Sequence, residues 1–214
     1  MAKRKPAKEH EEFIALLDRY KCSVTFHAVR TRFIGSICSP VADISPLQTL
    51  KNLWDGEFPA FDAMGDVNHL LNALINGLWN ELTAHQNPDY PFRLTPLTTK
   101  PTPGSLRLLA LTRQQEIEGF VEGVFGHHES LDFPESAHHA MRVLQDLRGM
   151  FSGVIHLLDN PNSQDDDSSL PGLVTNLNEV SRILEAEMNV AIQSFARARV
   201  QGNVSTSMTK PTMH

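Results

Sequence analysis

The sequence predicts an all-α fold, and three observations lead to this prediction. Apolar residues recur every three or four positions over most of the chain, which is the period of an amphipathic helix. No segment alternates apolar and polar residues in the way that marks a half-buried strand. Helix start signals, such as a serine followed by proline, precede several of the periodic segments. We therefore expect a helical protein with about seven helices.

Length and composition favour one domain. The chain has 214 residues, 41% of them hydrophobic and 21% charged. A chain of this length buries roughly 70% of the surface that its unfolded form exposes, so a substantial core is available. We expect a disordered basic segment at residues 1–8, a single helical domain at residues 9–200 and a disordered tail at residues 201–214.

Four helices are predicted in the first half of the chain. The first spans residues 9–20, and the second begins near Phe26 and ends before Pro40, which has no N–H to donate. Ser45 and Pro46 mark the start of a third helix, with serine as N-cap and proline at the first helical position. The fourth spans residues 66–85, and Asp66 is expected to cap it.

A proline-rich connector follows at residues 87–105 and joins the two helical halves. It carries five of the 13 prolines, so regular structure is not expected there. It also carries four large apolar side chains, which predict that it packs across the surface of the same domain. These are Tyr90, Phe92, Leu94 and Leu97.

Three helices are predicted in the second half. Thr112 and Gln115 form a capping-box pattern that predicts a helix start. Pro134 opens a long helix that continues to Leu158, a polar loop covers residues 160–169, and the last helix spans residues 171–200. Glycines interrupt the first two of these helices, and we expect close backbone approach where the two cross. They are Gly119, Gly123 and Gly126 on the first and Gly149 and Gly153 on the second.

The segment from Ile37 to His85 resembles the uncharacterised bacterial YecA/YgfB-like family. The matching features are Pro40, Ser45-Pro46, Trp54, Pro59-Ala60-Phe61 and Asn80-Glu81. The helix segment from Glu118 to Val124 is similar to the Gly-aromatic-x-x-Gly helix of the family, and the resemblance extends over most of residues 13–158. It implies an all-α fold with no established reaction. Some members carry a cysteine-rich zinc-binding extension, and this chain departs from them because no cysteine follows Cys38.

Charge and cysteine usage indicate a cytoplasmic protein. The formal net charge is -6, and the only two cysteines, Cys22 and Cys38, match neither a zinc knuckle nor a redox pair. Acidic residues follow the basic start, so no secretory signal is expected, and no stretch approaches the length of a membrane span. No cofactor is predicted.

A histidine-rich region offers a candidate metal site. Glu135 and His138 have the Glu-x-x-His spacing that places a carboxylate and an imidazole on one helical face, and Glu122 and His127 lie close in sequence. A di-metal bundle site needs two such pairs and two further acids, and only one pair is present. The alternative is a solvated, histidine-rich loop and helix start.

Asparagines form an i+4 ladder along the fourth predicted helix. Its members are Asn68, Asn72, Asn76 and Asn80. A ladder of amides is suited to accept the backbone of a partner, for which Asn72, Asn76 and Asn80 are the candidate residues, and the alternative is a solvated face.

Together these observations predict a non-enzymatic interaction or regulatory protein that binds another protein and forms a homo-oligomer. No catalytic spacing is present, since the chain has no Gly-x-Ser-x-Gly motif and no strand to carry one. A metal-dependent protein using Glu122, His127, Glu135 and His138 is the first alternative. A nucleic-acid accessory protein using Lys3, Arg4, Lys5 and Lys8 is the second, and the acidic balance of the chain disfavours it.

Overall fold

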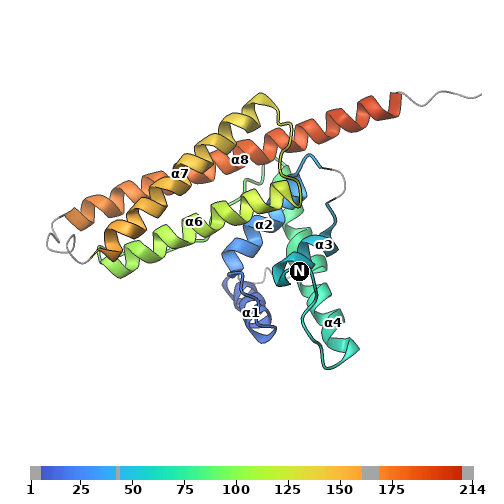
Figure 1. Ribbon diagram of the computed structural model, residues 1–214, viewed down its shortest axis with the longest axis horizontal. Helices are drawn as coiled ribbons and strands as arrows, with labels where there is room; N and C mark the ends of the chain where they lie inside the picture. The colour runs from blue at the N-terminus through green and yellow to red at the C-terminus, as the bar shows by residue number, and fades with distance from the viewer. Residues whose placement is uncertain (1–5, 42–43, 161–168, 209–214) are drawn as a thin grey trace, which may run out of the picture.

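The computed structural model describes residues 6–41, 44–160 and 169–208. Within these ranges the chain forms seven helical segments and no strand, so the all-α prediction is confirmed. The basic residues at positions 3–5 and most of the predicted polar loop at 160–169 lie outside the described residues. Figure 1 shows α6, α7 and α8 forming an upper layer, with α1, α3 and α4 below and α2 between them.

The first three helices agree with the sequence prediction. They are α1 (Pro6–Arg19), α2 (Phe26–Cys38) and α3 (Pro46–Lys51), which continues into the 3-10 turn η1 (Asn52–Trp54). The Oγ of Ser45 accepts the backbone N–H of Gln48, as expected of an N-cap. The indole Nε1–H of Trp54 donates to the carbonyl oxygen of Tyr20 at 2.8 Å, so this tryptophan joins η1 to the end of α1. Helix α1 begins at Pro6, before the predicted start at residue 9 and inside the segment that was expected to be disordered, with proline at the first helical position.

The fourth helix is one continuous run with a π-helical centre. It comprises α4 (Met64–Leu71), the π-helix η2 (Asn72–Trp79), α5 (Asn80–Leu82) and the 3-10 turn η3 (Thr83–Gln86). The prediction that Asp66 caps it is wrong, because the N-cap is Ala63. The carboxylate of Asp66 instead accepts a hydrogen bond from Arg19 at 2.9 Å and ties this helix to α1.

The connector is extended and is held by the last helix, α8 (Leu170–Met208). Asn189 bonds both backbone groups of Phe92, Glu185 accepts the N–H of Leu94 at 3.0 Å, and Gln193 donates to the carbonyl oxygen of His85 at 3.1 Å. These three α8 side chains are spaced four residues apart and so share one face. The expected packing is confirmed, since Phe92 and Leu94 are buried, although Tyr90 is exposed.

Helix α6 (Pro103–Phe125) begins earlier than predicted. Its N-cap is Thr102, whose Oγ1 accepts the N–H of Ser105. The predicted start at Thr112 is wrong, because Thr112 is buried inside the helix. A capping-box pattern is only local, and the apolar residues Leu106 to Leu111 extend the helical period in front of it.

Glycines bring α6 and α2 into close contact. A Cβ on Gly119 would meet the carbonyl oxygen of Ala28, and one on Gly123 would meet that of Arg32, in both cases well within 3.0 Å. The predicted close approach is therefore present, but the partner helix is α2 and not α7. A Cβ on Gly149 or Gly153 would have no neighbour within 4 Å.

A buried ion pair lies at the middle of α6. Glu116 is fully buried, and its carboxylate accepts Arg113 at 2.6 Å and the backbone N–H of Thr95 at 2.8 Å. The Nε of Arg113 donates to Ser181 on α8 at 3.2 Å. Connector, α6 and α8 therefore share one buried polar network, which is costly to leave half satisfied.

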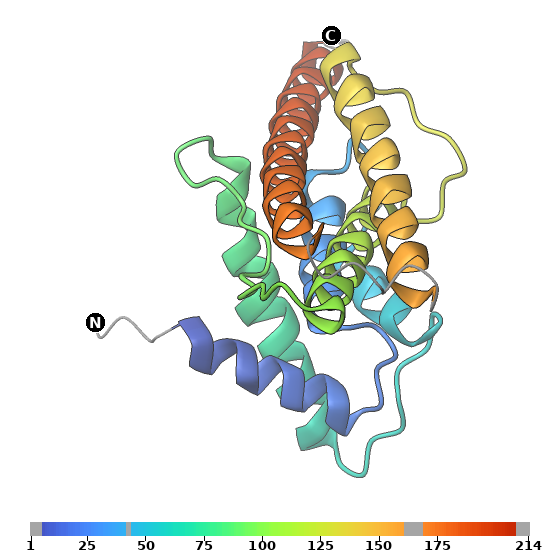
Figure 2. The same cartoon turned by 90° about the vertical axis from the view of Figure 1, so that its left-hand side faces the viewer.

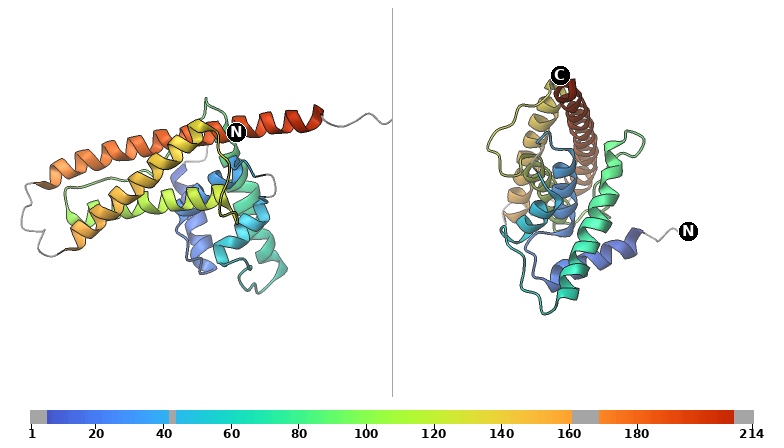
Figure 3. Two further views of the ribbon diagram at one scale, coloured as in Figure 1. Left: turned by 45° about the horizontal axis from the view of Figure 1, so that its top comes forward. Right: turned by 90° about the vertical axis from the view of Figure 1, so that its right-hand side faces the viewer.

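Helices α7 (Glu135–Asp159) and α8 form an antiparallel pair that lies against α6 (Figures 1 and 2). Pro134 is the N-cap residue of α7, so it directly precedes the first helical turn in which it was predicted to lie. Helix α8 reaches Met208, past the predicted end at Val200, because no proline occurs between Pro171 and Pro211 to stop the helix. The C-terminal end of α8 extends past the other helices (Figure 3, left).

Candidate functional site

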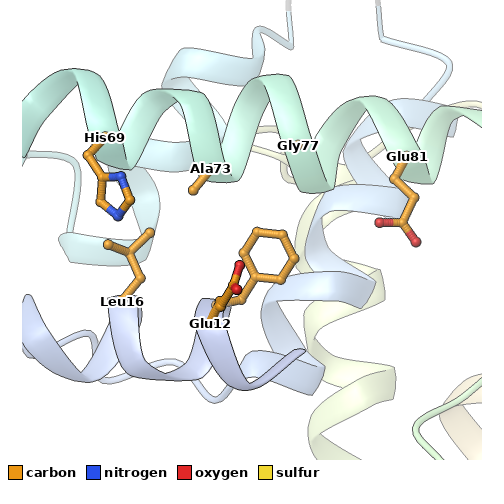
Figure 4. Close-up of a pocket in the computed structure, with 7 residues that line it drawn as sticks. Glu12, Leu16, His69, Ala73, Gly77 and Glu81 are labelled. Carbon is orange, nitrogen blue, oxygen red and sulfur yellow. The ribbon is translucent and has the colours of Figure 1, made fainter. Parts of the chain in front are cut away.

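A groove lies between α1 and the run formed by α4 and η2. Its volume is about 270 Å³, and seven residues line it: Glu12, Phe13, Leu16, His69, Ala73, Gly77 and Glu81. Figure 4 shows Leu16 and Glu12 on one wall, opposite His69, Ala73, Gly77 and Glu81 on the other. The second wall is a single stripe of residues spaced four apart, so one helix face supplies it.

Small residues keep the middle of the groove open. Ala73 and Gly77 contribute at most a methyl group to the wall. A Cβ on Gly77 would lie 3.7 Å from Cζ of Phe13, which is ordinary contact, so the glycine is not required for chain packing. Any side chain longer than alanine at this position would extend into the groove.

The wall is built on the π-helix. All of η2 from Asn72 to Trp79 has this wider turn, and a π segment inside an α-helix is frequent at functional sites. The inward side of η2 still packs normally, since Leu74 and Leu78 are buried and the ring of Trp79 lies 5.3 Å from that of Phe33. The π-helical turns are therefore anchored by ordinary core packing on their inward side.

Charges stand at the groove and apolar groups form its floor. Glu12 and Glu81 contribute carboxylates and His69 an imidazole, while Phe13 and Leu16 provide the apolar floor. Two carboxylates beside an apolar surface are chemically suited to a ligand that carries both a cation and a hydrophobic group.

The asparagine ladder runs beside this groove. Each of its members comes one position before a groove residue of the same helix, and all four are exposed. Asn76 donates to the side-chain oxygen of Asn72 at 2.7 Å, and Asn80 donates to the carbonyl oxygen of Asn76 at 3.3 Å. The ladder is thus pre-ordered on the surface next to the groove.

The four residues predicted for metal binding do not form a cluster. Glu122 on α6 pairs with Arg32 of α2. The rings of His127 and His128 are tilted by 33° with centroids 4.1 Å apart, and His138 lies edge-on to Phe133 at 6.3 Å. Glu135 is exposed at the first position of α7. Across the described parts of the chain, no group of three or more His, Cys, Asp or Glu side chains is arranged to hold a metal ion.

His138 instead borders an apolar hollow between α6 and α7. The hollow is lined by Val121, Phe125, Leu131, Phe133 and Met141, with Glu129, Ser130, Arg142 and Gln145 around them. Aromatic and aliphatic side chains do not bind metal ions, so the environment of His138 differs from the one that the Glu-x-x-His spacing suggested.

The sequence signal for the groove was present but incomplete. His69, Ala73, Gly77 and Glu81 repeat every four residues, and two small residues at adjacent turns indicate an open surface. The opposite wall could not be assigned because it comes from α1, and the pairing of these helices depends on contacts such as that between Arg19 and Asp66.

No helix within the described ranges is long and apolar enough to cross a membrane. Comparisons of the chain with protein-family models, with curated proteins and with solved structures gave no significant match.

Proposed function

We propose that the protein is a non-enzymatic interaction or regulatory protein of the bacterial cytoplasm, related to the YecA/YgfB-like family, and that its groove binds a segment of another protein. The observation that carries this proposal is the groove between α1 and η2, with its apolar floor and two carboxylates. The all-α fold is the one that the family resemblance implies, and the two unpaired cysteines are in keeping with a reducing compartment.

The side chains that line the groove indicate which side chains the partner segment carries. An aliphatic or aromatic side chain fits against Phe13 and Leu16, and a lysine or arginine next to it would face Glu12 or Glu81. The exposed amides of Asn72, Asn76 and Asn80 lie beside the groove, where they are placed to bond the backbone of that segment. We therefore assign the groove to a short basic and apolar segment.

Peptide titration followed by amide NMR tests this proposal. Peptides that combine one large apolar side chain with lysines should shift the signals of His69, Ala73 and Gly77, while peptides with glutamates in place of the lysines should not. Gly77→Leu should abolish the shifts by filling the groove. Gly65→Leu is the matched control, because a Cβ on Gly65 has no neighbour within 4 Å and the residue does not line the groove.

Two results would overturn the proposal. One is equal binding of acidic and basic peptides, or binding of neither, at the groove residues. The other is turnover of small substrates by the purified protein, since the proposed function has no chemical step.

A further inference from the structure

Helix α8 carries an exposed stripe with the spacing of a coiled-coil seam. We define the α8 stripe as five exposed residues on its outer side: Glu179, Ile183, Ala186, Val190 and Arg197, spaced four, three, four and seven apart. Gln193 occupies the remaining position of the pattern, but it is part-buried and donates to the carbonyl oxygen of His85. Ile183 is 41% exposed and Val190 is 44% exposed, although both are large and apolar. The 4-3 alternation is the one that packs one helix along another.

The neighbouring helix adds to this apolar face. On α7, Met150 is 54% exposed and Leu157 is 51% exposed, and they are seven residues apart on one side of the helix. Gly153 lies between them, with room on its surface for a close approach. Single exposed apolar residues are normal on a protein surface, whereas four of them on two helices that pack against each other are consistent with an interaction site.

The charges at the two ends of the α8 stripe favour a second copy of this chain as its binding partner. Glu179 stands at the N-terminal end and Arg197 at the C-terminal end, and both are exposed. In an antiparallel pair of α8 helices, Glu179 of each copy lies opposite Arg197 of the other, and Ala186 lies opposite Val190. The charged ends of the stripe and its centre at Ala186 and Val190 are therefore complementary to themselves under a two-fold axis, as an isologous dimer interface requires, and Ile183 lies opposite the part-buried Gln193.

The length of α8 agrees with the same register. Nine residues before Glu179 is Leu170, where α8 begins, and nine residues after Arg197 is position 206, close to its end at Met208. The two helices therefore overlap along almost their full length. The end of α8 that extends past the other helices in Figure 1 would lie along the first part of α8 in the second copy.

We infer that the protein forms an antiparallel homodimer through the α8 stripe, flanked by Met150 and Leu157 of α7. This inference specifies the self-association predicted from the sequence and does not depend on the groove between α1 and η2. Failure of peptide binding at the groove would leave it untouched, and a monomeric protein would leave the groove proposal untouched.

Sedimentation velocity across the micromolar range tests the dimer. The wild-type protein should sediment as a dimer, and Ile183→Glu combined with Val190→Glu should weaken association at least about 100-fold, since carboxylates would be buried without partners. Leu108→Glu is the control, because Leu108 is 56% exposed on α6, outside this face. A wild-type monomer, or a dimer unchanged by the double substitution, overturns the inference.

Charge reversal tests the register. Glu179→Arg and Arg197→Glu should each weaken association about tenfold, since two equivalent pairs become repulsive, and the two changes together should restore it. Within one copy Glu179 already pairs with the exposed Arg182, and the Nε of Arg197 donates to the backbone of Gln193. Both side chains must turn to meet the second copy, so failure of the double reversal to restore association excludes this register.

Disulfide trapping tests the orientation. Ala186→Cys mixed with Val190→Cys should yield a disulfide-linked dimer of the two different variants under mild oxidation. A parallel pair would instead place position 186 opposite itself, and Ala186→Cys alone would then crosslink. That second result overturns the antiparallel arrangement.

Discussion

Asn189 on α8 bonds both backbone groups of Phe92 in the connector. Its side-chain oxygen accepts the N–H of Phe92 at 2.8 Å, and its side-chain nitrogen donates to the carbonyl oxygen of the same residue at 3.0 Å. One amide thus satisfies a donor and an acceptor that an extended segment would otherwise leave unpaired at the edge of the core. The side chain substitutes for the strand that would pair with this backbone in a sheet.

We predict that Asn189→Ala lowers the free energy of unfolding by about 2–3 kcal/mol, because two part-buried backbone groups lose their partner. Asn189→Asp should cost less, since it retains the acceptor for the N–H of Phe92. Urea unfolding measures the loss, and hydrogen exchange at the Phe92 amide locates it. Unchanged exchange at Phe92 in the alanine variant would contradict the assignment.

The α2–α6 contact predicts opposite effects for two glycine substitutions. Gly123→Ala should destabilise the protein by about 3 kcal/mol, because the new methyl group collides with the backbone of Arg32. Gly149→Ala on α7 should stabilise it by about 0.5–1 kcal/mol, since that glycine is exposed with no close neighbour. Thermal unfolding of the two variants compares them directly, and equal shifts would argue against the close helix contact.

Removal of one member of the buried ion pair should strongly lower the free energy of unfolding. Glu116→Ala leaves Arg113 without its carboxylate and Thr95 without an acceptor, so we expect a loss of about 3–5 kcal/mol. Replacing both members, as in Glu116→Leu with Arg113→Met, should recover a large part of that loss. Chemical unfolding of the single and double variants measures the difference, and equal losses would show that the pair is not coupled.

The thiol of Cys38 should be inert in the folded protein. It is fully buried, and burial raises its pKa far above the ordinary range of a thiol. Cys22 is partly exposed, and burial raises the pKa of its thiol as well. We expect maleimide to modify Cys22 slowly and Cys38 only after unfolding, as mass spectrometry of the alkylated peptides would show. Rapid modification of Cys38 under native conditions would contradict the packing of α2.

The ion pair between Arg107 and Asp159 joins α6 to α7 and should respond to acid. Arg107 donates to Asp159 at 2.6 Å, and this hydrogen bond lowers the pKa of the Asp159 carboxyl below its ordinary value. A depressed folded-state pKa means that the stabilisation is complete above the unfolded-state pKa and is lost as the pH falls through the folded value. Asp159→Asn should therefore be less stable than wild type at pH 7, and the difference should disappear once the pH falls below the lowered folded-state pKa of Asp159. A stability difference that did not change with pH would exclude the ion pair as its source.

Local signals predicted the helices of this fold well, and the errors concern where helices begin and which helices pack together. Ser45 and Pro46 were sufficient to place the start of α3, because an N-cap and its acceptor lie within one turn. Thr112 failed as a start signal because an earlier apolar turn extends the helix in front of it. The glycines of α6 correctly indicated a close contact, but the choice of α2 over α7 depends on how the whole chain folds.

The candidate sites were likewise only partly predictable from the sequence, because they depend on contacts between distant segments. The asparagine ladder and the stripe from His69 to Glu81 are visible in the sequence, yet only the position of α1 makes a groove beside them. The side chains that do hold an extended backbone are on α8, where Asn189 and Glu185 bond the backbone of this chain's own connector. A side chain that bonds backbone atoms about a hundred residues away leaves no pattern in its own neighbourhood.

The hydrogen bonds between α8 and the connector can form only after α8 has been synthesised. Phe92 leaves the ribosome 97 residues before Asn189, so the nascent chain carries the connector without its hydrogen-bond partners over nearly half of its length. The first half of the protein can form its local helices in this period, but the buried aromatic ring of Phe92 has no completed site until α8 emerges. Chains that stop short of residue 185 should therefore leave Phe92 exposed and be prone to aggregation and to degradation.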